Sequence, residues 1–138
     1  MSQREIPQPT ESELEILKVL WAKGPSTVRE VNDQLNEQRT DGKDVGYTTS
    51  LKLLQIMFEK GLVARNTDAR THIFSAAFAQ ADVQRNLLQR LADSAFQGSA
   101  MQMVMHVLGR HDASSEELQE VKDLIEKVEK LKNSGLKN

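Results

Sequence analysis

The apolar positions between Thr10 and Leu35 fall at helical spacing in two groups. Members of each group lie three or four residues apart, which places their side chains on one face of a helix. The groups are Leu14, Leu17 and Trp21, and then Val28, Val31 and Leu35. A capping-box pair precedes each group, Thr10 with Glu13 and Thr27 with Glu30. Two short helices are predicted, joined at Gly24 and Pro25.

A third helix is predicted in the stretch "YTTSLKLLQIMFEKG", after the polar loop "NEQRTDGKDVG". Leu51, Leu54 and Phe58 form its expected buried stripe, which Leu53 and Met57 widen, and Gly61 ends it. This orientation leaves three polar residues on the outer face and two more beside them at the first turn. They are Thr48, Lys52 and Gln55, and then Thr49 and Ser50.

Two interpretations of these hydroxyls stay open. Thr and Ser are favoured at any helix start because they cap free backbone N–H groups. Alternatively, free N–H groups and short hydroxyls at a helix N-terminus suit phosphate oxygens, and side chains there can reach base edges in a major groove. Capping alone requires one hydroxyl, and this helix start has three.

The pattern then changes period. "LVARN" and "THIFSA" are short β-prone runs separated by "TDAR", which predicts a hairpin. From Lys43 to His72 five cationic residues face three anionic ones, and Arg65 and Arg70 lie on or beside the hairpin. These arginines suit contacts to a phosphate backbone, although a solvated charged hairpin would look the same. Three helices followed by a hairpin are the order of a winged helix-turn-helix.

Helical spacing returns after the hairpin. A long helix ended by Gly98 is predicted from the spacing of Val83, Leu87, Leu91 and Ala95. A short helix, "AMQMVMHVL", follows and can be capped by Ser99. A third capping box, Ser114 with Glu117, begins the last helix. The last helix carries a narrow apolar seam that lacks an assigned partner, so packing against a second copy is its simplest use. The expected interface residues are Leu87, Leu91, Met103, Val107, Leu118, Val121, Ile125 and Val128.

The predicted fold class is mainly α, with a winged helix-turn-helix domain followed by a helical dimerisation domain. The expected parts are a flexible leader at 1–9, the winged domain at 10–78, the dimerisation domain at 79–132 and a disordered tail at 133–138.

Composition narrows the function. The chain has 138 residues, no cysteine and a formal charge of −2, so any nucleic-acid footprint must be local. No apolar run approaches the ~20 residues of a membrane span, and the N-terminus lacks a signal-peptide pattern, so a cytoplasmic protein without membrane insertion is expected. Glycine-rich phosphate loops and hydrolase motifs are absent, and neither an enzyme nor a cofactor is expected. The stretch "MQMVMH" could indicate a soft-metal site formed by Met101, Met103, Met105 and His106. Helical spacing places Met101 and Met105 on one face and Met103 and His106 on another, so no metal is predicted.

Three stretches resemble one protein family. "TESELEILKVLWAKGPSTVREV", "YTTSLKLLQIMFEKGLVAR" and "SAFQGSAMQMVMHVLGRHDASSEELQEVKDLI" look like the BlaI/MecI family of penicillinase and methicillin-resistance repressors, to which the copper-responsive CopY proteins are related. The resemblance implies a homodimeric winged-helix repressor of inverted-repeat operators, dimerised through its C-terminal helices. It also implies that Thr48, Thr49 and Lys52 sit in the groove and that Arg65 and Arg70 touch the backbone. Together with the residue pattern, the expected DNA-binding set is Lys43, Tyr47, Thr48, Thr49, Lys52, Gln55, Arg65 and Arg70.

The resemblance further implies a release mechanism. In antibiotic-responsive members a membrane sensor with a metalloprotease domain triggers cleavage in the helix before the last one, and alignment on "GSAMQMVMHVLGRHD" places that bond between His106 and Val107. Members that are cleaved have Asn-Phe there, so loss of a ligand or partner stays as an alternative. Many members also have a basic residue where Ile56 stands, and copper sensing through cysteines is excluded.

The sequence therefore predicts a dimeric transcriptional repressor that binds double-stranded operator DNA. The alternative is a winged-helix scaffold that binds protein and assembles through its C-terminal helices. The outward Thr48 and Lys52 favour the repressor, and the weak net basicity favours the scaffold.

Overall fold

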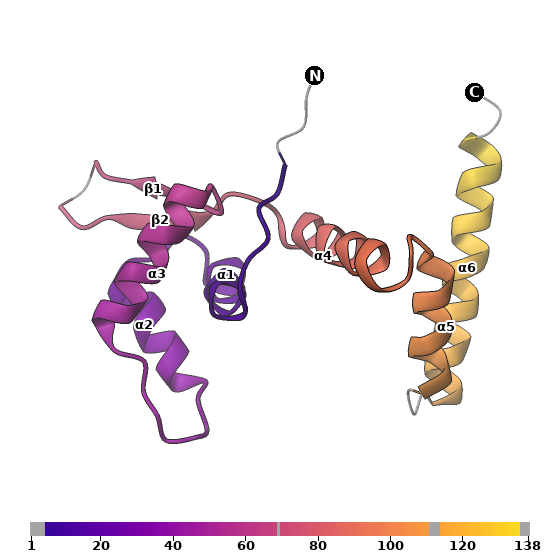
Figure 1. Ribbon diagram of the computed structural model, residues 1–138, viewed down its shortest axis with the longest axis horizontal. Helices are drawn as coiled ribbons and strands as arrows, with labels where there is room; N and C mark the ends of the chain where they lie inside the picture. The colour runs from indigo at the N-terminus through magenta and orange to yellow at the C-terminus, as the bar shows by residue number, and fades with distance from the viewer. Residues whose placement is uncertain (1–4, 69, 111–113, 136–138) are drawn as a thin grey trace. The chain divides into compact units, whose positions relative to one another are not determined.

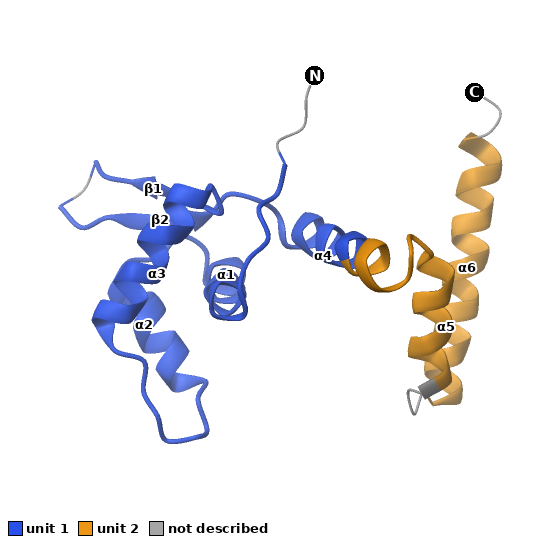
Figure 2. Cartoon of the chain, viewed as in Figure 1, with its two compact units in different colours: residues 1–90 blue, residues 91–138 orange. Residues whose placement is uncertain are grey.

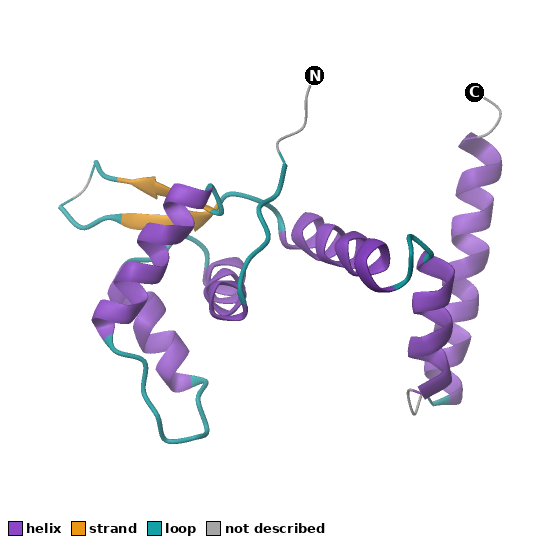
Figure 3. Ribbon diagram, viewed as in Figure 1, coloured by secondary structure: helices purple, strands orange, loops and turns teal. Residues whose placement is uncertain are grey.

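The computed structural model describes residues 5–68, 70–110 and 114–135 (Figure 1). Helices predominate, and the strands form one hairpin between the third and fourth helices (Figure 3). The chain forms two compact units, Met1–Arg90 and Leu91–Asn138 (Figure 2). The division falls inside the fourth helix, beyond the predicted boundary at Phe78, because the start of that helix belongs to the first unit. Val83, for example, is almost fully buried.

The first two helices begin where the sequence predicts. α1 spans Glu11–Lys23 and α2 spans Val28–Glu37, and both capping boxes are present, with Thr10 and Thr27 as the N-cap residues. In the second box the backbone N–H of Thr27 binds the Glu30 carboxylate and lowers its pKa. The capping predictions for these helices are confirmed.

The core of the first unit lies where α1 meets α2, α3 and the second strand. It is almost wholly aliphatic, as expected for a chain with 4% aromatic residues. The buried members are Ile16, Leu17, Val19, Leu20, Val28, Val31, Leu35, Leu54, Met57, Leu62, Val63 and Phe74.

α3 spans Tyr47–Lys60 and ends at Gly61, which adopts the predicted left-handed conformation at φ 88°. Its buried face differs from the predicted one: Ser50, Leu54 and Met57 are buried, and the expected core residue Phe58 is 38% exposed. Ser50 turns inward because its hydroxyl accepts a hydrogen bond from the buried Asn32 side chain. The predictions that Phe58 is buried and that Ser50 lies at the outer surface are therefore wrong.

The predicted hairpin is present. β1, Val63–Asn66, pairs antiparallel with β2, Ile73–Ala76, so that Val63 faces Ala76 and Asn66 faces Ile73. Ser26, between α1 and α2, adds a bridge to Phe74 through backbone hydrogen bonds of 2.8 and 2.9 Å. This bridge fixes the hairpin against the helices, and helical or strand spacing does not predict it.

Residues 5–9, predicted as a flexible leader, make specific contacts with the first unit. Pro9 is buried, and the backbone carbonyl of Ile6 accepts a hydrogen bond from Arg90 at 2.9 Å. The carbonyl of Gln8 accepts one from Lys60 at 3.3 Å. The leader differs from the prediction because these carbonyls find cationic donors on α3 and α4; residues 1–4 lie outside the described residues.

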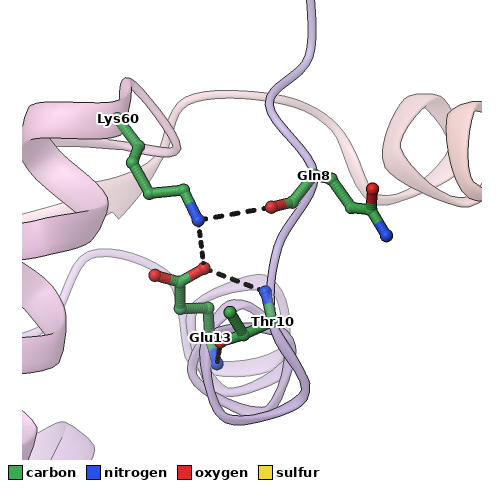
Figure 4. A network of polar contacts seen from close by, with 4 residues as sticks. All are labelled: Gln8, Thr10, Glu13 and Lys60. Carbon is green, nitrogen blue, oxygen red and sulfur yellow. Dashed lines mark hydrogen bonds and ion pairs between the residues drawn. The ribbon is translucent and has the colours of Figure 1, made fainter.

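An ion pair lies beneath the leader (Figure 4). The Glu13 carboxylate, whose side chain is 3% exposed, lies 2.6 Å from the Lys60 ammonium and accepts a hydrogen bond from the Thr10 N–H. Burial by itself raises the pKa of Glu13, but the hydrogen bonds and charge of Lys60 and the Thr10 N–H outweigh it, so the pKa lies below its ordinary 4.5. The ionised pair joins α1 to the end of α3.

Lys60→Met is expected to lower the free energy of unfolding at pH 7 by about 2 kcal/mol, because it leaves a buried carboxylate without its counterion. Since the folded-state pKa of Glu13 is depressed, its stabilising effect is present above 4.5 and is lost as the pH falls through the lower folded value. Urea denaturation from pH 7 to 3 measures both effects. Glu13→Gln, which cannot ionise, should show a weaker loss of stability in acid than the native protein; an equal loss in both would contradict this role.

The second unit holds the end of α4 and two further helices. α4 spans Gln80–Ala95, α5 spans Ala100–Arg110 and α6 spans Ser115–Gly135. Ser99 caps α5, and the Ser114–Glu117 capping box precedes α6, both as predicted. α6 continues to Gly135 through the start of the tail predicted at 133–138, because Asn133 and Ser134 are tolerated in a last helical turn; residues 136–138 lie outside the described residues.

Candidate nucleic-acid interface

The start of α3 is uncapped by side chains. Its N-cap residue is Gly46, which has no side chain to accept a hydrogen bond, and the first helical bond runs from the Ser50 N–H to the Gly46 carbonyl at 3.2 Å. The hydroxyls of Thr48 and Thr49 therefore do not serve as the N-cap. The backbone N–H groups ahead of Ser50 give this end the partial positive charge that attracts phosphate.

Three predicted reading residues share one exposed face of α3. Thr48, Lys52 and Gln55 are all exposed and stand at i, i+4 and i+7. Ile56, beside this face, is 38% exposed and supplies no charge. The face combines hydroxyl, ammonium and amide groups, which can donate hydrogen bonds to bases and phosphates.

Thr49 is exposed as predicted, but it lies on a different side of α3. It lines an open hollow together with Leu14 and Glu11 of α1 and Leu35 of α2. Thr49 thus lies beside the face formed by Thr48, Lys52 and Gln55, on the side toward α1. This face is the predicted reading face, and Thr48 belongs to it.

Arg65 on β1 is held by an aromatic platform. Its guanidinium carbon lies 4.2 Å from the centre of the Phe58 ring, a cation–π contact, and its Nε is buried without a hydrogen-bond partner in the described part of the chain. Stacking on Phe58 restricts the guanidinium and leaves its terminal nitrogens as the groups that can bind phosphate. This contact explains why Phe58 lies at the surface.

The remaining predicted DNA-binding residues are exposed at the surface of the same unit. Arg70 lies in the hairpin connection, Lys43 lies in the loop before α3, and Tyr47 is 47% exposed. The Tyr47 ring lies 5.8 Å from the guanidinium carbon of Arg29 on α2.

Sequence reasoning missed Arg29. It is exposed in the first turn of α2, and its contact with Tyr47 places a cation next to the start of α3. The position of Arg29, a basic residue on the polar face of the second predicted helix, could have indicated this role from the sequence. Lys60, in contrast, is engaged by Glu13 and does not add to the charge facing a ligand. Arg29 restores the local cationic excess that this ion pair removes.

The predicted dimerisation residues of the second unit are largely exposed. Met103 and Val121 are partly buried, whereas Val107, Leu118, Ile125 and Val128 are between 41% and 63% exposed. α6, which is described along its whole length, buries none of its residues. On α4, Leu87 is partly buried and Leu91 is 48% exposed. A helix pair with this much apolar surface in water is typical of a protein interface.

His106 and Val107, the predicted cleavage pair, lie within α5 and are exposed. The His106 ring lies 5.6 Å from the Phe96 ring, just beyond the end of α4. No helix in the described ranges is long and apolar enough to cross a membrane. Among the described residues, no three His, Asp or Glu side chains gather as a metal site.

A three-helix unit with an exposed third helix and an attached hairpin defines a winged-helix DNA-binding protein. Comparison with known families identifies the family within this class of protein. The chain belongs to the penicillinase repressor family, whose model matches residues 9–127. Members of this family are transcriptional repressors, so the chain is a DNA-binding repressor and not an enzyme, and the resemblance in the sequence is confirmed.

Individual relatives agree with this assignment. The chain is 24% identical to the penicillinase repressor of Bacillus licheniformis over 123 residues, which cover 89% of this chain and 93% of that protein. It is 29% identical to the transcriptional regulator BlaI of Mycobacterium tuberculosis over 97 residues, or 69% and 67% of the two chains. A MarR family protein from Bacillus stearothermophilus shares the fold, with a TM-score of 0.50 and 19% identity over 90% of this chain and 75% of that one.

Proposed function

We propose that the protein is a homodimeric repressor that binds inverted-repeat operators, with residues 10–78 as the DNA-binding domain and 79–132 as the dimerisation domain. The observation that carries this proposal is the start of α3, where Thr48, Lys52 and Gln55 share an exposed face beside uncapped backbone N–H groups. In this assignment α3 enters the major groove and its side chains read base edges. The protein acts on DNA in the cytoplasm.

The backbone contacts come from cations around α3. Arg65 is preorganised by Phe58, Arg70 lies in the hairpin connection, Lys43 lies in the preceding loop and Arg29 lies at the start of α2. Phosphate contacts of this kind position a protein without reading sequence. Because α3 reads bases and these cations bind phosphates, substitutions in the two groups should have different effects on binding to operator and random DNA.

Dimerisation follows from the second unit. Its apolar side chains on α5 and α6 are exposed, and burying them against the same surface of a second copy would remove them from water. A twofold dimer presents two symmetry-related copies of α3, which is why its operator should be an inverted repeat.

Release of the repressor is proposed to occur by cleavage between His106 and Val107 through a membrane sensor metalloprotease. Both residues are exposed in α5, and a cut there would separate the α6 seam from the DNA-binding unit. The bond lies inside a helix, so cleavage requires α5 to open locally. Because α5 is largely exposed, the free energy of such opening should be low.

Exposure of cells to a β-lactam is expected to convert the full-length protein into a shorter fragment on an immunoblot. His106→Asp, which changes the residue ahead of the cut, should slow that conversion. A full-length band that persists while the target genes switch on would reject proteolysis and favour loss of a ligand or partner.

Lys52→Ala is expected to weaken operator binding by about 1–3 kcal/mol and to weaken binding to random DNA by less, because it removes a base-reading side chain together with one cation. Thr49→Ala should act in the same direction. Arg65→Ala should instead weaken operator and random DNA alike, because it removes a phosphate contact. Fluorescence anisotropy titrations on both duplexes make the comparison, and equal losses on both DNAs for all three variants would show that the reading face lies elsewhere.

Gel-shift titration tests the function itself. The probe is the promoter fragment upstream of the protein's own gene, and the control is a shuffled duplex of equal length and composition. Preferential retardation of the promoter fragment is expected from a repressor. Equal and weak binding to both would favour a protein-binding scaffold.

A further inference from the structure

Two asparagines on α2 hold the chain just ahead of α3. Asn32 and Asn36 stand at i and i+4, so their side chains leave the same face of the helix. The Asn36 Oδ1 accepts a hydrogen bond from the Val45 N–H at 2.6 Å, and its Nδ2 donates to the Val45 carbonyl at 3.0 Å. Asn32 Nδ2 donates to the same carbonyl at 2.9 Å. Both backbone polar groups of Val45 are therefore bound by α2.

The cluster also reaches the first turn of α3. Asn32 Nδ2 donates a second hydrogen bond, at 2.9 Å, to the hydroxyl of Ser50. Ser50 is fully buried and Asn32 is 9% exposed, so this bond is sheltered from water. One end of the cluster holds the residue before the N-cap Gly46, and the other end holds the first turn of the helix.

Besides these hydrogen bonds, the described residues place the Tyr47 ring 5.8 Å from the Arg29 guanidinium carbon at this helix start. Gly46 provides no side-chain cap, and the connection from Gln38 to Asp44 is exposed and includes Gly42 at φ 74°. A long polar connection leaves the helix that follows it poorly positioned unless other contacts hold it. The hydrogen bonds of Asn32 and Asn36 supply such contacts at the end of α3 that carries Thr48 and Lys52.

We propose that Asn32 and Asn36 are positioning residues for sequence recognition: they hold the start of α3 so that its outer face meets base edges in one fixed geometry. This inference rests on the proposed reading role of α3. Hydrogen-bond readout requires accurate placement of the reading side chains, whereas phosphate attraction tolerates small shifts. Loss of the cluster should therefore reduce sequence discrimination more than it reduces DNA affinity.

The variants are Asn36→Ala and Ser50→Ala in the full-length protein. The first frees the Val45 N–H and removes one of the two donors to the Val45 carbonyl. The second removes the Ser50 acceptor of Asn32 without changing α2. Because Ser50 is fully buried, its hydroxyl cannot touch DNA, and any loss of discrimination must act through the position of α3. Thr10→Ala is the matched control, since it removes a hydrogen bond of similar length at the capping box of α1.

Two readouts are measured. The first is amide hydrogen exchange of Ser50 and Leu51 by NMR without DNA, which should accelerate about tenfold in Asn36→Ala and stay near the native rate in Thr10→Ala. The second is the ratio of affinities for the promoter fragment and the shuffled duplex, which should fall about tenfold in both cluster variants but not in the control.

The two readouts separate the possible failures. Native exchange rates in Asn36→Ala, or an unchanged affinity ratio in both cluster variants, would overturn the positioning role. If the native protein itself did not prefer the promoter fragment, the proposed function would fail, and the exchange rates alone would still decide whether the asparagines hold the start of α3.

Discussion

Truncation after Phe96 is expected to leave a folded, largely monomeric DNA-binding unit whose affinity for the operator is about 10²–10⁴-fold lower. The core of the first unit is retained, because its buried residues all precede the cut. The exposed apolar surface of α5 and α6 is removed. Two linked half-sites gain from effective concentration, and a monomer loses that gain. Sedimentation velocity measures the mass, and anisotropy titration measures the affinity.

Two full-length variants control for the effects of removing residues 97–138. Ile125→Glu places a charge in the apolar seam of α6 and should reproduce the monomer and most of the affinity loss. Lys130→Glu introduces the same residue on the opposite face of that helix and should leave a dimer. A truncated protein that still sediments as a tight dimer would place the interface in the first unit.

Raising the salt concentration from 50 to 200 mM is expected to weaken operator binding by about 10⁴-fold. Arg29, Lys43, Arg65 and Arg70 are four proposed phosphate contacts in each subunit, or eight in the dimer, and each releases a counterion on binding. A chain with a formal charge of −2 has no general attraction to DNA, so this dependence must come from the local cations.

Arg70→Ala should lower the slope of log affinity against log salt by about two in the dimer, one contact from each subunit. Lys130→Glu, which lies outside the DNA-binding unit, serves as the control and should leave the slope unchanged. A shallow slope in the native protein, equivalent to one or two contacts, would contradict the assignment of these cations to the backbone.

Local sequence rules located the helices and their starts. Thr10, Thr27 and Ser114 cap the helices that the spacing predicts, and Gly61 ends α3 in a left-handed conformation. These features depend on residues three or four positions apart, so the sequence contains them directly. The exposed Thr48 and Lys52 also follow from the helical period.

The features that the sequence did not reveal depend on distant partners. Phe58 has the spacing of a core residue, but Arg65 on the hairpin stacks over it at the surface. Helical spacing groups Ser50 with the outer hydroxyls, although Asn32 on α2 binds it in the interior. The charge count from Lys43 to His72 includes Lys60 as a cation, yet Glu13 on α1 forms an ion pair with it. Each outcome requires knowledge of which elements meet, and helical periodicity does not provide it.

Selection of bound fragments from a sheared genomic library at about 100 mM salt decides whether the protein is a dimeric repressor of inverted-repeat operators. We expect enrichment of an inverted repeat whose half-site centres lie about 10 base pairs, or a multiple of that, apart, with one subunit on each half-site. Enrichment of no palindromic sequence, from a protein that is folded and dimeric, would contradict it.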